Sequence, residues 1–457
     1  MGKETQQYPI DSRCKDCSLF QVVEELKKEI VVLKTKVAEL EKELEQYRKP
    51  PKDSNNSSIP SSQNRWNKQY PQRKNSTLKT GGQQGHTGTN KAYSENVDEV
   101  ISLDTNICPY CGGTHFIENE KKFKRKQLID IDITPKTTEY IQHHLICSNC
   151  KRKIPNIPFA TKGNVEYGAF LNSIVGYMNI QCNMSYSRIV KFFKEICKIN
   201  LSEGTIDNII NKLAEYHSVN TDTILVNLKK SKVIGSDETS IRVNKKNKYL
   251  WVLQNEQYSY FAKGDRSFDT LTNIIGTDYN GYWVSDRYHA QLKVGCKHQL
   301  CLSHIIRECR YLIESEKSVF ANDLKNILEK SIHFRNECGT NYEPTNQNIF
   351  RKIQALEKEL SVLFTKKPKE KDSLKLWKSL VCRQKELLLF LRDKDIPPTN
   401  NASERALRNL VTKRKVSGCC RSEQGAYRQC VISSVIETAK KQCIDVLQAL
   451  STNFVFA

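Results

Sequence analysis

Two aspartates and one glutamate, far apart in the chain, are the residues whose types and surroundings best suit metal chemistry. Asp237 follows a strand-like run in KVIGSDETSIRV, and Asp286 ends a second apolar run, GYWVSDRYHA. Glu404 lies in PPTNNASERALRN, where two prolines stop one element and a helix begins. Acids at such positions can converge on one site, and hard divalent cations prefer carboxylate oxygens. Two such ions, about 4 Å apart, stabilise both the attacking and the leaving oxygen of a phosphodiester.

Each acid also has a structural interpretation. Glu238 follows Asp237, and because a strand points neighbouring side chains to opposite faces, only one of the two can enter a shared site. With Asn401 as N-cap, Glu404 would occupy position N3 and form half of a capping box. Asp237 and Asp286, taken singly, would also serve as turn or cap residues. The sequence leaves these alternatives open.

Four cysteines form two C-x-x-C pairs, one in CPYCGG and one in CSNC. Each pair can offer two thiolates to one tetrahedral Zn²⁺, and the intervening residues alternate like a pair of strands. We predict one structural zinc ion bound by Cys108, Cys111, Cys147 and Cys150, with metal-free cysteines as the alternative. The pair Cys14 and Cys17 stands alone. Further along, we interpret Cys301 and His304, with Cys296 and His298 nearby, as packing residues rather than a second metal site.

Composition and charge indicate a polyanionic partner. The 457 residues include 72 Lys and Arg against 51 acids, a formal charge of +21, which favours nucleic acid over a merely solvated basic surface. No run approaches the roughly 18 apolar residues of a membrane span. Because the N-terminus lacks the layout of a secretion signal, we expect a cytoplasmic, nucleoid-associated protein without membrane contact, with reduced cysteines. The Lys, Asn and Ile bias suits an AT-rich bacterial genome.

The N-terminal third divides into a self-pairing helix, a linker and a zinc module. Residues 18–49 carry a heptad repeat with β-branched residues at a (Val23, Ile30, Val37) and leucines at d (Leu26, Leu33, Leu40). This pattern favours a parallel two-stranded coiled coil, hence a homodimer; an amphipathic helix packed on its own protein is the alternative. Residues 50–95 are polar and basic, typical of a disordered linker. The zinc module follows at 100–158.

Residues 163–220 read as helices, of which the last two are separated by a short turn before Ser202, a natural N-cap. This outline fits a helix-turn-helix, but an ordinary helical bundle fits equally well. From residue 230 onward, strand-like runs are followed by helical ones. We therefore expect a multidomain α+β protein whose last domain spans 230–457.

Several of these blocks, in this order, resemble the DDE transposases of the insertion-sequence 66 family. They are NSSIPSS, GGQQGHTG, CPYCGG with CSNC, SDETSIRV, WVSDRYHAQ, CLSHIIRECRYL, and TNNASERALRNLVTKRKVSG with RSEQGA. The chain departs from the family pattern in two places. Arg287-Tyr288 replaces Gly-Tyr after the second aspartate, and Leu302-Ser303 replaces the aromatic between Cys and His.

The resemblance implies an RNase H-like (α/β, mixed-sheet) catalytic domain with a helical insertion at about 319–394. It implies that Asp237 bridges two Mg²⁺ ions, that Asp286 and Glu404 each hold one of them, and that Mn²⁺ can substitute. The implied reaction is 3′-end cleavage at terminal inverted repeats and strand transfer into target DNA, with accessory proteins of the same element as further partners. The DNA-contacting residues would be Arg405, Arg408, Lys413, Arg414 and Lys415, unless they form a solvated face. Two rival functions are a non-catalytic zinc-finger and helix-turn-helix regulator, and a metal nuclease that cuts without joining.

Overall fold

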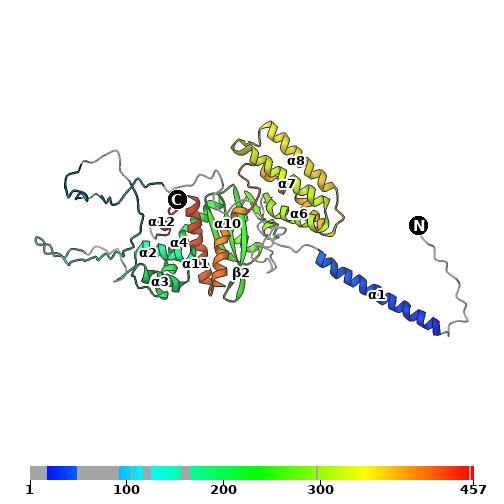
Figure 1. The fold of residues 1–457 in the computed structure, drawn as a ribbon, viewed down its shortest axis with the longest axis horizontal. Coiled ribbons are helices and arrows are strands. Elements are labelled where there is room, and N and C mark those ends of the chain that lie inside the picture. The colour runs from blue at the N-terminus through cyan, green and yellow to red at the C-terminus, as the bar shows by residue number, and fades with distance from the viewer. Residues whose placement is uncertain are drawn as a thin grey trace. The chain divides into compact units, whose positions relative to one another are not determined.

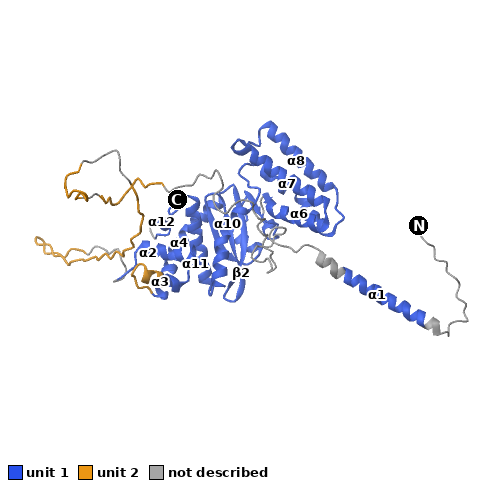
Figure 2. Ribbon diagram, in the orientation of Figure 1, with its two compact units in different colours: residues 1–65, 163–189, 202–457 blue, residues 66–162, 190–201 orange. Residues whose placement is uncertain are grey.

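The computed structural model describes residues 18–48, 92–103, 106–116, 125–155, 165–294, 297–451 and 454–456, with side chains of the first helix described for 22–41. Cys14, Cys17, Cys296 and most of the expected linker lie outside these ranges. The chain divides into two compact units, shown in Figure 2. One comprises residues 1–65, 163–189 and 202–457, and the other comprises 66–162 and 190–201.

A sheet, of which Figure 1 labels strand β2, lies at the centre of the larger unit. It has five strands in the order β3-β2-β1-β4-β5. The strands are β1 (Val233–Val243), β2 (Lys246–Gln254), β3 (Ser259–Gly264), β4 (Tyr282–Ser285) and β5 (Lys297–Leu300). The first three form an antiparallel meander, whereas β4 and β5 run parallel to β1. A two-residue turn with positive φ at Asn244 (45°) and Lys245 (64°) joins β1 to β2, which suits a tight hairpin. This topology is compatible with the expected RNase H-like domain.

Two long helices, α10 (Asn401–Ser417) and α11 (Glu423–Lys441), cover one face of the sheet. The strands bury alternate apolar residues against these helices, since side chains alternate between faces along a strand. That core consists of Ile241, Val243, Leu250, Val252 and Phe261 with Ala406, Leu407, Leu410, Ala426 and Cys430. The other face carries α5 (Phe268–Ile275), which packs near a short 3₁₀ helix at Gln291–Lys293.

Further helices precede the sheet in sequence: α2 (Ala169–Ile180), α3 (Tyr186–Glu195) and α4 (Glu203–Lys229). The expected cap of α4 is confirmed, because Ser202 Oγ accepts a hydrogen bond from the Thr205 N–H at 3.0 Å. One side of α4 packs against α2, α11 and β3. α12 (Val446–Ala449) completes this layer. Two successive helices thus occupy the expected helix-turn-helix region, and its DNA-reading role stays a prediction.

A helical bundle interrupts the chain between β5 and α10. It contains α6 (Leu302–Glu316), α7 (Val319–Cys338), α8 (Gln347–Thr365), α9 (Lys371–Leu380) and two 3₁₀ helices (Val381–Glu386 and Leu389–Leu391). Their apolar faces share one core with β4 and β5, including Val284, Leu300, Leu324, Leu356 and Phe390. The bundle begins and ends at one place, since the Leu302 N–H donates to the Pro398 carbonyl at 3.0 Å.

The remaining long helix, α1 (Ser18–Arg48), exposes its apolar stripe. The a and d residues from Val23 to Leu40 are each at least 45% exposed, so nothing in the described chain covers them. Of the helices that the structure describes, none has the length and apolar character that crossing a bilayer requires.

Candidate active site

Asp237 lies in the middle of β1, on the face that α10 covers. It has the same parity along the strand as Ile241 and Val243, which pack against α10 and α11. Its Oδ1 accepts a hydrogen bond from the Glu238 N–H at 2.9 Å. The alternation of side chains therefore directs Asp237 toward the start of α10.

Glu238 points to the opposite face, where its carboxylate is already bound. Arg266 donates to Oε1 at 2.8 Å and Gln291 donates to Oε2 at 2.9 Å. The Glu238 side chain is only 2% exposed. Strand alternation therefore directs Asp237, and not Glu238, to the α10 side of the sheet. On the other side, both carboxylate oxygens of Glu238 already accept hydrogen bonds.

Asp286 follows the last residue of β4, the strand that pairs in parallel with β1. The register of the two strands ends at the pair Gly235 and Val284, so Asp237 and Asp286 each lie two residues beyond the last pair. The Oδ1 of Asp286 accepts a hydrogen bond from the Tyr288 N–H at 2.9 Å, which fixes the loop after β4. The charge of Asp286 raises the pKa of Asp237, which indicates that the two carboxylates lie within electrostatic range of each other.

Glu404 lies in the first turn of α10, and its surroundings rule out the capping box. The N-cap is Asn400 rather than Asn401, and Asn400 Nδ2 donates to the Ser236 carbonyl at 2.6 Å. Glu404 Oε1 instead accepts a hydrogen bond from His304 Nε2 at 2.8 Å, with an Arg307 nitrogen 3.7 Å away. The contact between Asn400 and Ser236 places this end of α10 beside Asp237.

The electrostatics of the site reflect this crowding of acids. Burial raises the pKa of Asp237 well above its ordinary value, and the negative charges of Glu238, Asp286 and Glu404 raise it further. In contrast, the hydrogen bond from His304 lowers the pKa of Glu404, with help from Arg307 and Arg408. A bound cation would offset this repulsion between carboxylates.

Cys301 and His304 lie beside Glu404. Cys301 is buried, as expected of a packing residue, whereas His304 is only partly buried and binds the Glu404 carboxylate. The thiol, the imidazole and the Glu404 carboxylate each have a donor atom within 4.8 Å of the others. However, Cys301 Sγ accepts a hydrogen bond from the Asn400 N–H at 3.1 Å, and burial raises the pKa of this thiol to about 11. The hydrogen bond from Asn400 ties this thiol to the start of α10. We therefore interpret Cys301 and His304 as residues that position α10 and Glu404.

His298, by contrast, packs as expected. It is buried, and its Nε2 lies 2.7 Å from the Val294 carbonyl.

Lys413, which the sequence assigned to DNA, is bound inside the protein. Its Nζ donates to the backbone carbonyl of Asn179 at 2.6 Å and to the side-chain oxygen of the same residue at 3.1 Å. Burial lowers the pKa of Lys413 to about 8. Because the ammonium group is held by Asn179 at the end of α2, we correct this assignment.

Arg414 also bonds within the protein, to the strand that carries Asp237. Its guanidinium donates to Thr239 Oγ1 at 3.2 Å and to Ser240 Oγ at 2.9 Å. These bonds fix the C-terminal half of α10 on β1. The remaining basic residues assigned to DNA, Arg405, Arg408 and Lys415, are exposed.

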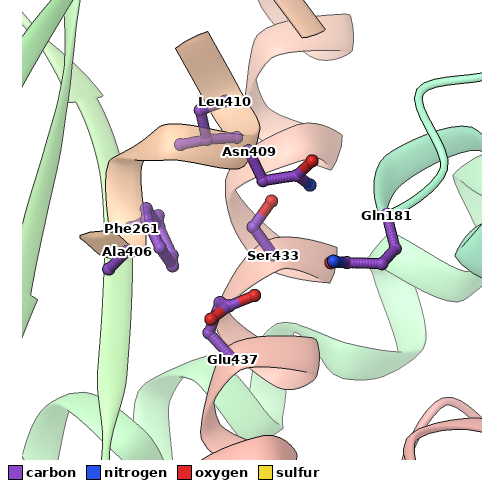
Figure 3. A pocket seen from close by; sticks show the side chains of 7 residues that line it. All are labelled: Gln181, Phe261, Ala406, Asn409, Leu410, Ser433 and Glu437. Carbon is purple, nitrogen blue, oxygen red and sulfur yellow. The ribbon is translucent and has the colours of Figure 1, made fainter. Parts of the chain in front are cut away.

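A narrow gap lies beside α10. Figure 3 shows it lined by Ala406, Asn409 and Leu410 of α10, together with Phe261, Ser433, Glu437 and Gln181. It is too small to hold a water molecule. At its edge, Asn409 Nδ2 donates to the Ile180 carbonyl at 2.8 Å, which links α10 to the end of α2.

The two C-x-x-C pairs of the smaller unit each form a knuckle turn. The Gly112 N–H donates to the Cys108 carbonyl at 2.9 Å, and the Lys151 N–H does the same to Cys147. Backbone N–H groups aimed at the first sulfur of each pair lower the pKa of Cys108 and Cys147, which suits metal-binding thiolates. Among the described residues, however, the four sulfurs do not gather into one cluster. The zinc site remains a prediction.

The five-stranded mixed sheet and the helices that flank it form an α/β domain compatible with the RNase H-like class. Residues 165–428, more than half of the chain, match the protein-family model described as Transposase IS66 family. The chain belongs to this family.

A similar curated protein is "Uncharacterized protein y4jO" from Sinorhizobium fredii (strain NBRC 101917 / NGR234), which is 38% identical over 87 residues. That alignment covers 19% of this chain and 27% of the relative.

Proposed function

We propose that this protein is a DNA transposase that cuts at the terminal inverted repeats of an insertion sequence and joins the ends to target DNA. The observation that supports the proposal is that Asn400, at the start of the helix that carries Glu404, hydrogen-bonds the Ser236 carbonyl next to Asp237, while Asp286 follows the adjacent strand β4. Membership of the IS66 family supports the same reaction class. The formal charge of +21 supports DNA as the substrate.

The carboxylates fit divalent metal chemistry, because all three offer hard oxygen ligands. Asp237 would bridge two Mg²⁺ or Mn²⁺ ions, Asp286 would hold one, and Glu404 would hold the other. Two such ions supply activation of water or a 3′-hydroxyl and stabilisation of the leaving oxygen. His304 holds the Glu404 carboxylate by a hydrogen bond, and Asn400 keeps the helix start against Ser236.

The other parts of the chain would hold the DNA and assemble the active complex. The knuckles around Cys108 and Cys147 would bind one structural Zn²⁺, and this module would contact the repeats together with α3 and α4. The exposed apolar stripe of α1 supports pairing with a second copy, which would bring two transposon ends together. Exposed Arg405, Arg408 and Lys415 would contact phosphates near the cut.

One incubation separates the proposal from its rivals. Purified full-length protein is mixed with Mg²⁺, target DNA and a labelled duplex that carries an inverted repeat flanking the coding region. A transposase cuts and joins, a nuclease only cuts, and a regulator only binds. Asp237→Ala should abolish cutting and leave DNA affinity intact, whereas the control Asp278→Ala, at an exposed acid before β4, should cut like the wild type. If Asp237→Ala cuts normally, the site is misassigned.

A further inference from the structure

An open groove of about 440 Å³ lies between α6 and α10, beside Glu404. Nine residues line it: Ser303, Ile306, Arg307, Arg310, Glu329, Asn401, Glu404, Arg405 and Arg408. Four of the nine are arginines, and two are acids. The groove therefore carries a net positive charge next to the proposed catalytic glutamate.

The arginines come in two pairs, one on each wall. Arg307 and Arg310 are three residues apart on α6, and Arg405 and Arg408 are three apart on α10, so each pair projects from one side of its helix. The side chain of Arg310 is 51% exposed and that of Arg307 is 23% exposed. The walls thus present guanidinium groups to the same open space.

The acids of the groove leave much of this charge unpaired. Arg307 lies 3.7 Å from Glu404, and Arg310 lies 3.3 Å from Glu329 of α7. Within the described part of the chain, neither Arg405 nor Arg408 has an acid at ion-pair distance. The groove would therefore accept a ligand with more than one negative charge.

The chemistry of the lining points to a phosphodiester backbone. Guanidinium groups bind phosphate oxygens with two parallel hydrogen bonds, and they do so more selectively than ammonium groups. None of the nine lining residues is aromatic, so the groove offers no platform on which bases could stack. Contacts of this kind set the position of a strand without reading its sequence.

We propose that this groove binds the sugar-phosphate backbone of the DNA strand that leads away from the cut, and that α6 of the helical bundle supplies half of the contacts through Arg307 and Arg310. The inference rests on the proposed transposase function. In the free protein Arg310 pairs with Glu329, and a bound phosphate replaces Glu329 as the partner of Arg310. Since Glu329 also repels the incoming phosphate, this acid weakens DNA binding.

The two sides of that ion pair therefore predict effects of opposite sign. Arg310→Ala should lower the affinity of the full-length protein for a labelled inverted-repeat duplex, measured without divalent metal, by about two- to fivefold. The slope of log affinity against log salt should fall by about one, since one phosphate contact is lost. Glu329→Gln should instead raise the affinity.

A second ion pair of the same bundle provides matched controls. Lys330 of α7 and Glu359 of α8 lie 2.8 Å apart, are 50% and 45% exposed, and do not line the groove. Lys330→Ala removes a positive charge, as Arg310→Ala does, and Glu359→Gln removes a negative charge, as Glu329→Gln does. Lys330 directly follows Glu329 on α7, and Glu359 is its ion-pair partner on α8. Both should leave affinity and salt slope at the wild-type values.

The outcomes separate the two proposals. If the wild type cuts and joins DNA but Arg310→Ala and Glu329→Gln behave like their controls, the groove inference is wrong and the transposase proposal stands. If the wild type neither binds nor cuts the duplex, the proposed function itself fails. Opposite shifts for the two groove variants, with unchanged controls, support the groove.

Discussion

Nε2 of His304 lies 2.8 Å from Oε1 of Glu404, although the two residues are 100 positions apart in the chain. The contact joins the first turn of α6 to the first turn of α10. Cys301, three residues before His304, bonds to the backbone of Asn400 in the same place. The C-x-x-H segment, Cys301 to His304, therefore positions both the start of α10 and the carboxylate of Glu404.

Replacing His304 should impair cutting without impairing DNA binding. His304→Ala removes the donor that orients Glu404, and changes to residues that orient metal ligands typically cost about ten- to hundredfold in metal affinity or activity. We expect the Mg²⁺ concentration needed for half-maximal single-turnover cleavage to rise. His304→Gln, whose amide can still donate, should recover part of the loss. If His304→Ala needs the same Mg²⁺ concentration as the wild type for half-maximal cleavage, His304 does not position Glu404.

Gly235 allows α10 to approach β1 closely. A Cβ atom there would lie 2.8 Å from both Gln254 Nε2 and Ser403 Oγ. Gly235→Ala should therefore push the start of α10 away from β1. We expect a loss of about 1–3 kcal/mol of unfolding free energy and slower cleavage than in the wild type. The control is Gly204→Ala in α4, where the added Cβ meets its nearest neighbour at 3.7 Å. Chemical denaturation of both variants tests this, and equal stabilities would contradict it.

Lys413 should influence stability rather than DNA affinity. Its pKa of about 8 in the folded protein lies below its ordinary value of 10.5, so between these pH values the unfolded chain binds more protons and stability rises with pH. Lys413→Met should show a smaller rise in melting temperature over this window and wild-type DNA affinity at pH 7. Arg408→Ala, on the exposed side of the same helix, should show the reverse pattern. A loss of DNA affinity in Lys413→Met would restore the original assignment.

Cys108→Ser should release the structural zinc. Removing one thiolate of a four-sulfur site weakens zinc binding strongly, so the metal content of the purified protein should fall from about one equivalent toward zero. Cys382→Ser, at an exposed thiol of the helical bundle, serves as the control and should retain zinc. Elemental analysis of both variants decides the matter, because equal zinc contents exclude the site.

The α1 stripe should mediate self-association. Leu33→Glu places a charge at a d position and should convert a dimer to a monomer in analytical ultracentrifugation. Thr35→Glu adds the same charge at position f, on the outer side of the helix, and should remain dimeric. If the wild type is itself monomeric at micromolar concentration, the coiled-coil interpretation fails.

Local patterns were sufficient to predict the features that depend on local periodicity. The alternation of β1 singles out one acid of the Asp237–Glu238 pair, and the cap of α4 followed from Ser202. Helical periodicity could also have excluded Lys413 from the DNA face. It lies three and seven residues after Leu410 and Ala406, on the stripe that faces the core, whereas Arg405 and Arg408 lie off it.

Other features depend on contacts between distant segments. The choice of Asn400 over Asn401 as N-cap is set by the Ser236 carbonyl, on a strand far upstream. The role of His304 depends on how the bundle returns to the sheet. Parallel pairing joins β1, which carries Asp237, to β4, which ends just before Asp286, although β2, β3 and α5 lie between them in the sequence. No local pattern specifies such a pairing.

The meeting of Leu302 with Pro398 has an evolutionary consequence. Because the helical bundle starts and ends at the same point, turns can be added to or deleted from its outer helices while the acids keep their spacing. Relatives can therefore differ widely in the size of this bundle and still perform the same reaction. The residues that cannot vary independently are those around Leu302 and Pro398, where the bundle joins the sheet domain.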